Sequence, residues 1–126
     1  MSQKTIQSET SAAPVGPYSP ALKVENLLFI SGQIPLKSDG ALVEGDFEAE
    51  VHQVMHNIGE LLTAAGLGYQ DLVKVGIFTT DLSQFDVINR IYPEYVNEPY
   101  PARAAIEVPR LPKNARIEME AIAYVK

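Results

Sequence analysis

The sequence predicts a single α+β domain over residues 1–126, with one mixed β-sheet and two helices on one face of it. Three observations lead to this fold class. The length of 126 residues suits one domain that buries its own hydrophobic core. Segments of alternating apolar and polar residues are interspersed with two segments of helical periodicity. Their order (strand, strand, strand, helix, strand, helix, strand, strand) is typical of helices packed against a single sheet.

Six segments have the residue alternation expected of β-strands. They cover residues 3–7, 22–24, 27–31, 72–79, 103–108 and 116–125. A tight Glu25-Asn26 turn joins the second and third, which predicts a hairpin. In the fourth, Val73, Val75 and Ile77 are expected on the packed face. The last two are joined by a proline-bounded loop, so they are also expected to be neighbours in space.

Residues 11–21 contain three prolines and a glycine, so they are predicted to form an ordered loop. Tyr18 lies in the middle of this loop, where prolines hold it stiffly. Two interpretations of Tyr18 stay open: packing against the core, or presenting its hydroxyl to a cleft. At the end of the third strand, Gly32 allows a ligand or another backbone to come close, or it forms a bulge.

Two segments have the periodicity of helices. In the first, apolar residues recur at helical spacing: Phe47, Val51, Val54, Met55, Ile58, Leu61, Leu62 and Ala65. Asp46 can cap the start of this helix, and Gly66 suits the position just after its end. The second helix begins near Ser83. We expect Pro93 to bend or split it, because proline cannot donate a helical hydrogen bond.

The first helix also carries His52, His56 and Glu60, which are four residues apart. This spacing can hold a metal ion on one side of a helix. However, these residues lie on the polar face, where charged and polar side chains are expected anyway, and no further ligand is evident. The sequence therefore predicts no metal site.

The two C-terminal strands carry charged residues on one of their predicted faces. Arg103 and Ala105 occupy this face on one strand, and Glu118 and Glu120 occupy it on the other. A half-buried charge must pair or bind something, because an unpaired buried charge is strongly destabilising. On residue types alone, a structural ion pair within an oligomer interface and a site for a charged ligand remain alternatives.

Two helices can cover only one face of the sheet. The other face is expected to include Ala105, Ile122 and Tyr124, and a large exposed apolar patch usually marks a contact with a partner. A symmetric homo-oligomer that closes sheet against sheet is the simplest solution. Clefts between its subunits would then be lined by the face that carries Arg103 and Glu118.

Composition and charge exclude several classes of partner. The net charge is −6 and the ten basic residues are scattered, which argues against nucleic acid. No apolar run approaches the roughly 18 residues that cross a membrane. The first residues contain no apolar stretch typical of a secretory signal. The chain has no cysteine, so it has no disulfide or thiolate nucleophile. These observations predict a cytoplasmic protein.

Several motifs, taken together and in order, resemble the RidA family, also called the YjgF family. They are GPYSPA (16–21), SGQIP (31–35), AAGLGYQDLVKV (64–75), PAR (101–103), LPK (111–113) and IEMEAIA (117–123). The resemblance implies a chorismate-mutase-like fold assembled as a homotrimer, with active sites between subunits. It also implies hydrolysis of reactive enamines and imines, such as 2-aminoacrylate, to 2-keto acids and ammonia. These compounds are released by PLP-dependent dehydratases.

The resemblance also assigns roles to individual residues. Arg103 corresponds to the arginine that holds the substrate carboxylate, and Glu118 to the carboxylate that handles water. The remaining pocket positions are Tyr18, Ser31, Gly32, Asn89 and Ala105. Two features depart from the family pattern. Ala105 stands where many members have cysteine, so only its backbone can contribute, and Pro93 follows a helix that is usually uninterrupted.

The chemistry implied for this pocket needs neither a metal nor an organic cofactor, because imine hydrolysis mainly requires the reactants to be oriented. An arginine can hold the carboxylate of an imino or keto acid, and Glu118 can act as general base. Donors from Ser31 or nearby backbone would steady the intermediate. Two alternatives remain: a regulatory protein that binds 2-keto acids without turnover, and a ribonuclease or translation inhibitor.

Overall fold

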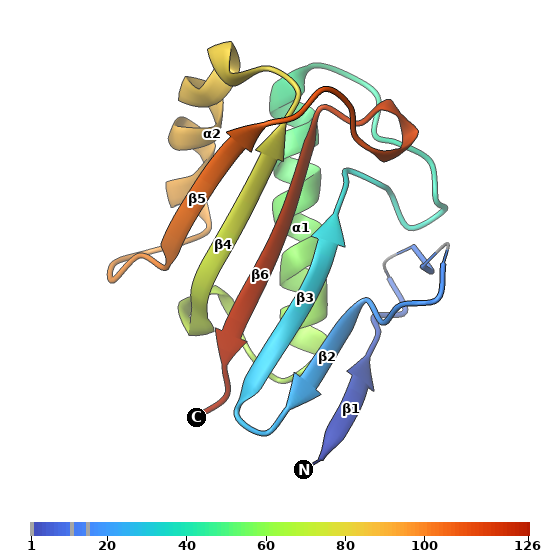
Figure 1. Ribbon diagram of the computed structural model, residues 1–126, viewed down its shortest axis with the longest axis vertical. Helices are drawn as coiled ribbons and strands as arrows, with labels where there is room; N and C mark the ends of the chain where they lie inside the picture. Colours follow the sequence, from blue (N-terminus) through green and yellow to red (C-terminus); the bar gives the residue numbers. More distant parts are fainter. Residues whose placement is uncertain (1, 11, 15) are drawn as a thin grey trace.

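The protein is described by a computed structural model, which covers residues 2–10, 12–14 and 16–126 (Figure 1). The predicted order of strands and helices is confirmed within these residues. The strands are β1 (Gln3–Ile6), β2 (Ala21–Val24), β3 (Leu27–Gln33), β4 (Leu72–Thr79), β5 (Ala102–Glu107) and β6 (Ile117–Tyr124). The two α-helices are α1 (Phe47–Ala64) and α2 (Phe85–Ile91).

The strands form one sheet in the order β1-β2-β3-β6-β4-β5. The sheet is mixed, as predicted, because β4 and β5 run parallel while the other neighbouring strands are antiparallel. The parallel pair is connected through α2, as a parallel connection requires a long crossover. An irregularity in the pairing of β3 with β6 lies between Ile30 and Gln33, so Ser31 and Gly32 leave the regular ladder, while Gln33 pairs with Met119.

Helix α1 runs behind the sheet and supplies much of the core (Figure 1). Its start is capped as predicted, since the Asp46 side chain accepts a hydrogen bond from the backbone N–H of Ala49 at 2.9 Å. Beyond its end, Gly66 has a φ of +77°, a conformation that glycine adopts without strain. Side chains of one α1 face, including Val51, Val54 and Leu61, are fully buried against the sheet.

Helix α2 ends at Ile91, and the chain continues into a 3₁₀ turn, η3 (Tyr92–Glu94). The prediction that Pro93 would end or split the helix is therefore confirmed. The proline lies after the α-helical turns, so Asn89 sits on regular helix. Buried Ile88 and Ile91 hold α2 against the core beside α1.

The core lies between the sheet and the two helices, and one core residue predicted on β4 is wrong. Val75 and Ile77 are buried as expected, but Val73 is 44% exposed and Leu72 is buried in its place. The pairing of β4 with β6 shifts register between Leu72 and Lys74. This shift changes the phase of the alternation, which a period-two pattern cannot anticipate.

The other face of the sheet is open. Four large apolar side chains on it are exposed: Leu27, Phe29, Ile106 and Tyr124. An open face was expected, because two helices cover only one side of the sheet. The side chains that β5 contributes to this face were not predicted correctly. Ala105 packs against the core and Ile106 is exposed, which is the reverse of the prediction. β5 is an edge strand rich in alanine, so its hydrophobic pattern leaves open which face is buried.

No helix in the described part of the chain is both long and apolar enough to cross a membrane.

Candidate active site

Arg103 and Glu118 lie on opposite faces of the sheet. Arg103 pairs across β4 and β5 with Val75, which is buried on the helix side, whereas Glu118 pairs with Phe78 on the open side. Paired residues of neighbouring strands point to the same face. The expectation that Arg103 and Glu118 share one face is therefore wrong. The error has the same origin as that for Ala105, namely the phase of β5.

Arg103 is held by neutral groups of α2 and η3. Its Nη2 donates a hydrogen bond to Asn89 Oδ1 at 2.7 Å. The guanidinium carbon lies 5.3 Å from the ring centre of Phe85 and 5.0 Å from that of Tyr92, within the range of cation–π attraction. Among the residues that the structure describes, Arg103 forms no ion pair with a carboxylate, since the two ion pairs present join other residues. Most of its donors are therefore free for a ligand.

A hollow of about 360 Å³ lies beside this arginine. It is lined by Asn89, Tyr92, Pro93, Tyr100, Pro101 and Arg103. Burial raises the pKa of the Tyr92 hydroxyl, and the charge of Arg103 partly offsets this effect. In the described part of the chain, this hydroxyl is the buried side-chain polar atom left without a hydrogen-bond partner. The hollow thus combines the Arg103 guanidinium with aromatic and proline walls.

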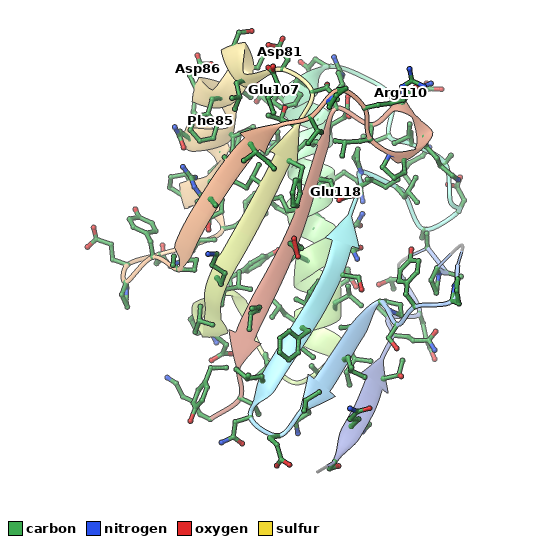
Figure 2. The ribbon with its side chains drawn as sticks, in the orientation of Figure 1. Asp81, Phe85, Asp86, Glu107, Arg110 and Glu118 are labelled. Atoms are coloured by element: carbon green, nitrogen blue, oxygen red, sulfur yellow. The ribbon has the colours of Figure 1, made fainter. Side chains whose placement is uncertain are left out.

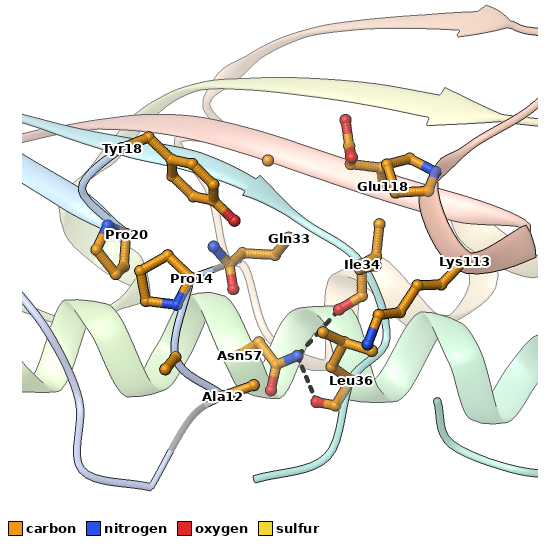
Figure 3. Close-up of a pocket in the computed structure, with 13 residues that line it drawn as sticks. Ala12, Pro14, Tyr18, Pro20, Gln33, Ile34, Leu36, Asn57, Lys113 and Glu118 are labelled. Atoms are coloured by element: carbon orange, nitrogen blue, oxygen red, sulfur yellow. Dashed lines mark hydrogen bonds between the residues drawn. The ribbon is translucent and has the colours of Figure 1, made fainter. Parts of the chain in front are cut away.

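Glu118 lies on the open side of β6 at a second cavity of about 230 Å³ (Figures 2 and 3). Gly32 of β3 makes room for it, because a Cβ at this glycine would lie 2.8 Å from the Glu118 carboxyl group. Burial raises the pKa of Glu118, and the negative charge of Glu120 raises it further. Such a carboxylate is a stronger base than one in open water.

Tyr18 and Gly32 line the Glu118 cavity, as the motifs implied. Tyr18 is 49% exposed, so the packing interpretation is excluded and its hydroxyl faces the cavity (Figure 3). Ser31 does something different. Its hydroxyl donates to the carbonyl of Ser19 at 2.7 Å, and its N–H donates to the carbonyl of Pro20 at 2.9 Å. The donors of Ser31 hold the Tyr18 loop and are not free for a reaction intermediate.

Three polar residues that line this cavity were not predicted: Gln33, Asn57 and Lys113. Asn57 of α1 is buried and donates to the carbonyls of Ile34, at 3.2 Å, and Leu36, at 2.9 Å (Figure 3). It therefore fixes the cavity wall that follows β3. A signal for Asn57 existed in the sequence, because it is three residues after Val54 and hence lies on the buried face of the helix. Lys113 gave no such signal, since it lies in a loop.

The residues once considered as metal ligands are otherwise engaged. His52 Nδ1 and His56 Nε2 lie 2.6 and 3.1 Å from the hydroxyl of Tyr95, and Glu60 accepts a hydrogen bond from Thr10. Within the described residues, no group of three His, Cys, Asp or Glu side chains is placed to hold a metal ion. These histidines instead tie the segment after α2 to α1.

The fold and the two cavities define a small α+β protein in which a cavity beside Arg103 and a cavity beside Glu118 lie on opposite faces of one sheet. A family model described as Endoribonuclease L-PSP matches residues 8–125. A RutC family protein of Pyrococcus abyssi is 46% identical over 125 residues, with 98% of each chain covered. The human 2-iminobutanoate/2-iminopropanoate deaminase is 40% identical over 122 residues, covering 96% of this chain and 89% of the human protein.

Solved structures agree with the sequence comparison. The crystal structure of RidA from an Antarctic Psychrobacter species superposes with a TM-score of 0.92 at 43% identity, covering 97% of this chain and 99% of that one. The chain belongs to the RidA family, as its motifs indicated.

Proposed function

We propose that this protein is a 2-iminobutanoate/2-iminopropanoate deaminase, which hydrolyses enamine and imine acids such as 2-aminoacrylate to 2-keto acids and ammonia. The observation that carries the proposal is Arg103, a cation held in place by Asn89 and two aromatic rings yet without a carboxylate partner in the described chain. A relative with 40% identity bears the name of this deaminase, which supports the assignment.

Arg103 would bind the substrate carboxylate. A guanidinium donates two parallel, charge-assisted hydrogen bonds to a carboxylate, which fixes its orientation as well as its position. The bond to Asn89 and the contacts with Phe85 and Tyr92 occupy one end and the face of the group. The side chain is therefore pre-organised, and less conformational entropy is lost when the ligand binds.

Glu118 would act on water. As general base it takes a proton from a water molecule, whose oxygen attacks the imine carbon to give a carbinolamine. It returns this proton to the imine nitrogen, which completes the neutral carbinolamine. Glu118 then takes the proton of the carbinolamine hydroxyl and delivers it to the nitrogen, so the carbonyl forms as the C–N bond breaks, and ammonia and a 2-keto acid leave. One water is consumed and no electrons are transferred. The raised pKa of Glu118 suits both steps, because a group that must accept and return a proton works best near the operating pH.

This division of labour requires more than one copy of the chain. Arg103 and Glu118 lie on opposite faces of the sheet, so one chain cannot bring both to the same small substrate. The open face carries exposed Phe29, Ile106 and Tyr124, which a second copy would cover. We therefore propose a homotrimer in which Arg103 of one subunit meets Glu118 of the next.

The test is an assay that couples this protein to a PLP-dependent serine or threonine dehydratase and follows release of the keto acid and of ammonia. The wild-type protein should accelerate release, and Arg103→Ala should abolish the acceleration while assembly remains intact. Arg90→Ala is the matched control, because Arg90 forms an exposed pair with Glu48. If Arg103→Ala keeps full activity, the assignment is wrong.

The same assay separates the non-catalytic alternative. A regulatory protein would bind 2-oxobutanoate through Arg103, detectable by calorimetry, without releasing ammonia from an imine. Binding of this kind in the absence of turnover would replace the enzymatic assignment.

A further inference from the structure

A second carboxylate lies beside Glu118 on the open face of the sheet. Glu120 follows Glu118 by two residues on β6, so the two side chains leave the same face about 7 Å apart along the strand. Each lies over a glycine of a neighbouring strand. A Cβ at Gly32 would meet the carboxyl group of Glu118, and one at Gly76 would lie 3.1 Å from Cγ of Glu120. The sheet thus leaves space for both carboxylates.

The remaining surroundings of Glu118 contain few other charges. β3 and β4 contribute Gly32 and Phe78, which do not titrate. The titratable groups that share its cavity are Tyr18 and Lys113. The ammonium group of Lys113 donates to the carbonyl of Gly40 at 3.2 Å, in the loop after β3. Glu120 is therefore the negative charge that acts on Glu118, and it raises the pKa of that group in addition to burial.

We propose that Glu120 tunes the general base Glu118, so that its negative charge sets the pH below which the enzyme loses activity. Glu120 is a positioning residue in this proposal, since it acts through Glu118 and contacts no reacting atom. The inference rests on the proposed deaminase function. A like charge beside a carboxylate favours the protonated form, which makes the ionised form a better proton acceptor.

Assembly should strengthen this coupling. In one chain the open face is in contact with water, which screens the two carboxylates from each other. A second copy that covers the face would exclude this water. Arg103 of the partner copy would favour ionised Glu118, but it does so equally in the wild type and in a Glu120 variant, so a comparison of the two isolates Glu120.

The experiment is the pH dependence of kcat/KM for the wild type and three variants. Glu120→Gln keeps the shape and removes the charge, so the acid limb of its profile should shift to lower pH. Glu120→Asp keeps the charge and should retain a limb close to that of the wild type. Glu25→Gln removes a charge in the distant turn between β2 and β3 and should change nothing. An unchanged acid limb in Glu120→Gln overturns the proposal.

A second measurement does not depend on turnover. NMR titration of ¹³C-labelled glutamate carboxyl groups, with the Glu118 signal assigned by Glu118→Gln, reports the midpoint of Glu118 directly. This midpoint should fall in Glu120→Gln and stay in Glu25→Gln; equal midpoints in wild type and Glu120→Gln overturn the proposal. If Glu120→Gln fails to fold, Glu120→Thr serves as a neutral substitute suited to a strand.

The two proposals fail in different ways. A wild type without imine hydrolysis, together with a midpoint that falls in Glu120→Gln, rejects the deaminase and the proposed tuning of its activity, while leaving the electrostatic coupling of the two carboxylates. If the protein hydrolyses imines but neither the acid limb nor the titration midpoint of Glu118 changes in Glu120→Gln, only the tuning role is rejected.

Discussion

The surroundings of Arg103 and Glu118 act on the two side chains by different physical means. Neutral groups orient Arg103: an amide oxygen at 2.7 Å and two aromatic rings, none of which neutralises its charge. Partial burial and a like charge act on Glu118 and raise its pKa. Arg103 therefore keeps its charge without a carboxylate partner among the residues that the structure describes, and ionised Glu118 becomes a better acceptor of protons.

We expect Gly32→Ala to lower the activity of the protein and to leave its stability almost unchanged. In Gly32→Ala the new Cβ would lie 2.8 Å from the carboxyl group of Glu118, and the flexible end of that side chain can move away at little cost. We expect kcat to fall by roughly tenfold or more, because a displaced catalytic group loses its alignment with the reacting atoms. Steady-state kinetics and thermal unfolding measure the two effects separately.

The contrary results for Gly32→Ala are easy to recognise. If Gly32→Ala has the same kcat as the wild type, the Glu118 carboxyl group is not needed in its present position. A large loss of stability would instead point to a backbone role for Gly32. Gly16→Ala provides a comparison, since a Cβ there makes only ordinary contact, at 3.5 Å, with Tyr18.

At the scale of elements, α1 is fastened to the chain that follows it by one tyrosine. Tyr69 belongs to a 3₁₀ turn, η1 (Tyr69–Asp71), and its hydroxyl donates to the carbonyl of Met55 at 2.8 Å. The ring lies against the helix at Gly59, where no side chain intervenes. Burial raises the pKa of this hydroxyl to about 12, which keeps it a neutral donor at physiological pH.

Gly59→Ala tests whether this contact outweighs helix propensity. Alanine favours a helix over glycine by about 1 kcal/mol, so propensity alone predicts stabilisation. A Cβ at position 59 would lie 2.8 Å from Cζ of Tyr69, and relieving such an overlap typically costs about 1–3 kcal/mol. We therefore expect a lower free energy of unfolding in urea titrations.

A double-mutant cycle supplies the control for Gly59→Ala. In a Tyr69→Ala background the ring is absent, so adding Gly59→Ala should be neutral or stabilising. Destabilisation of similar size in both backgrounds would mean that the overlap with Tyr69 is not the cause.

Periodicity predicted the helices and strands well. It did not always predict which face of a strand is buried. The cap at Asp46, the end of the helix near Pro93 and the strand at 72–79 follow from local rules, and the structure confirms each. The failures are Val73 and β5, where a register shift and an alanine-rich edge strand left the buried face undetermined. Such phases are set by pairing with other strands.

At the scale of the whole molecule, the proposed homotrimer would account for both the open sheet face and the separation of Arg103 from Glu118. Apolar side chains remain exposed on the face that carries Glu118, while Arg103 lies on the other side of the sheet. A homotrimer that closes over the open face would bury these side chains and bring the two half-sites together.

Mixing two inactive variants tests this arrangement. Arg103→Ala and Glu118→Gln should each be inactive, but in a mixed trimer one of the three sites combines an intact Arg103 from one chain with an intact Glu118 from the next. Random assembly from equal amounts should restore about a quarter of the wild-type activity in the unfractionated mixture, and about a third after purification through both tags removes the unmixed trimers. Differently tagged chains, mixed by co-expression and purified through both tags, show that mixed assemblies form.

A control for this mixing uses the variant with both substitutions. Combined with Arg103→Ala it leaves no intact arginine in any trimer, so activity should stay absent. Mixed assemblies of the two single variants that remain inactive would contradict a site shared between chains.

Local physics was enough to predict from the sequence the order of strands and helices and the first helix with its caps, and the motifs were enough to predict the family. Asp46, Gly66 and Pro93 act within a few residues of themselves, and motifs spread along the chain identify its relatives. The sequence also pointed to Arg103, Glu118 and Tyr18 as residues of interest.

Long-range pairing decided the rest. The register of β5 on β4 places Arg103 on the helix side of the sheet, and that of β6 on β4 places Glu118 on the other. The folded chain also brought Asn57 and Lys113 to the Glu118 cavity and committed the donors of Ser31 to the loop at residues 19–20. No local sequence pattern identifies the partner in any of these contacts, because each contact joins segments that are distant in the sequence.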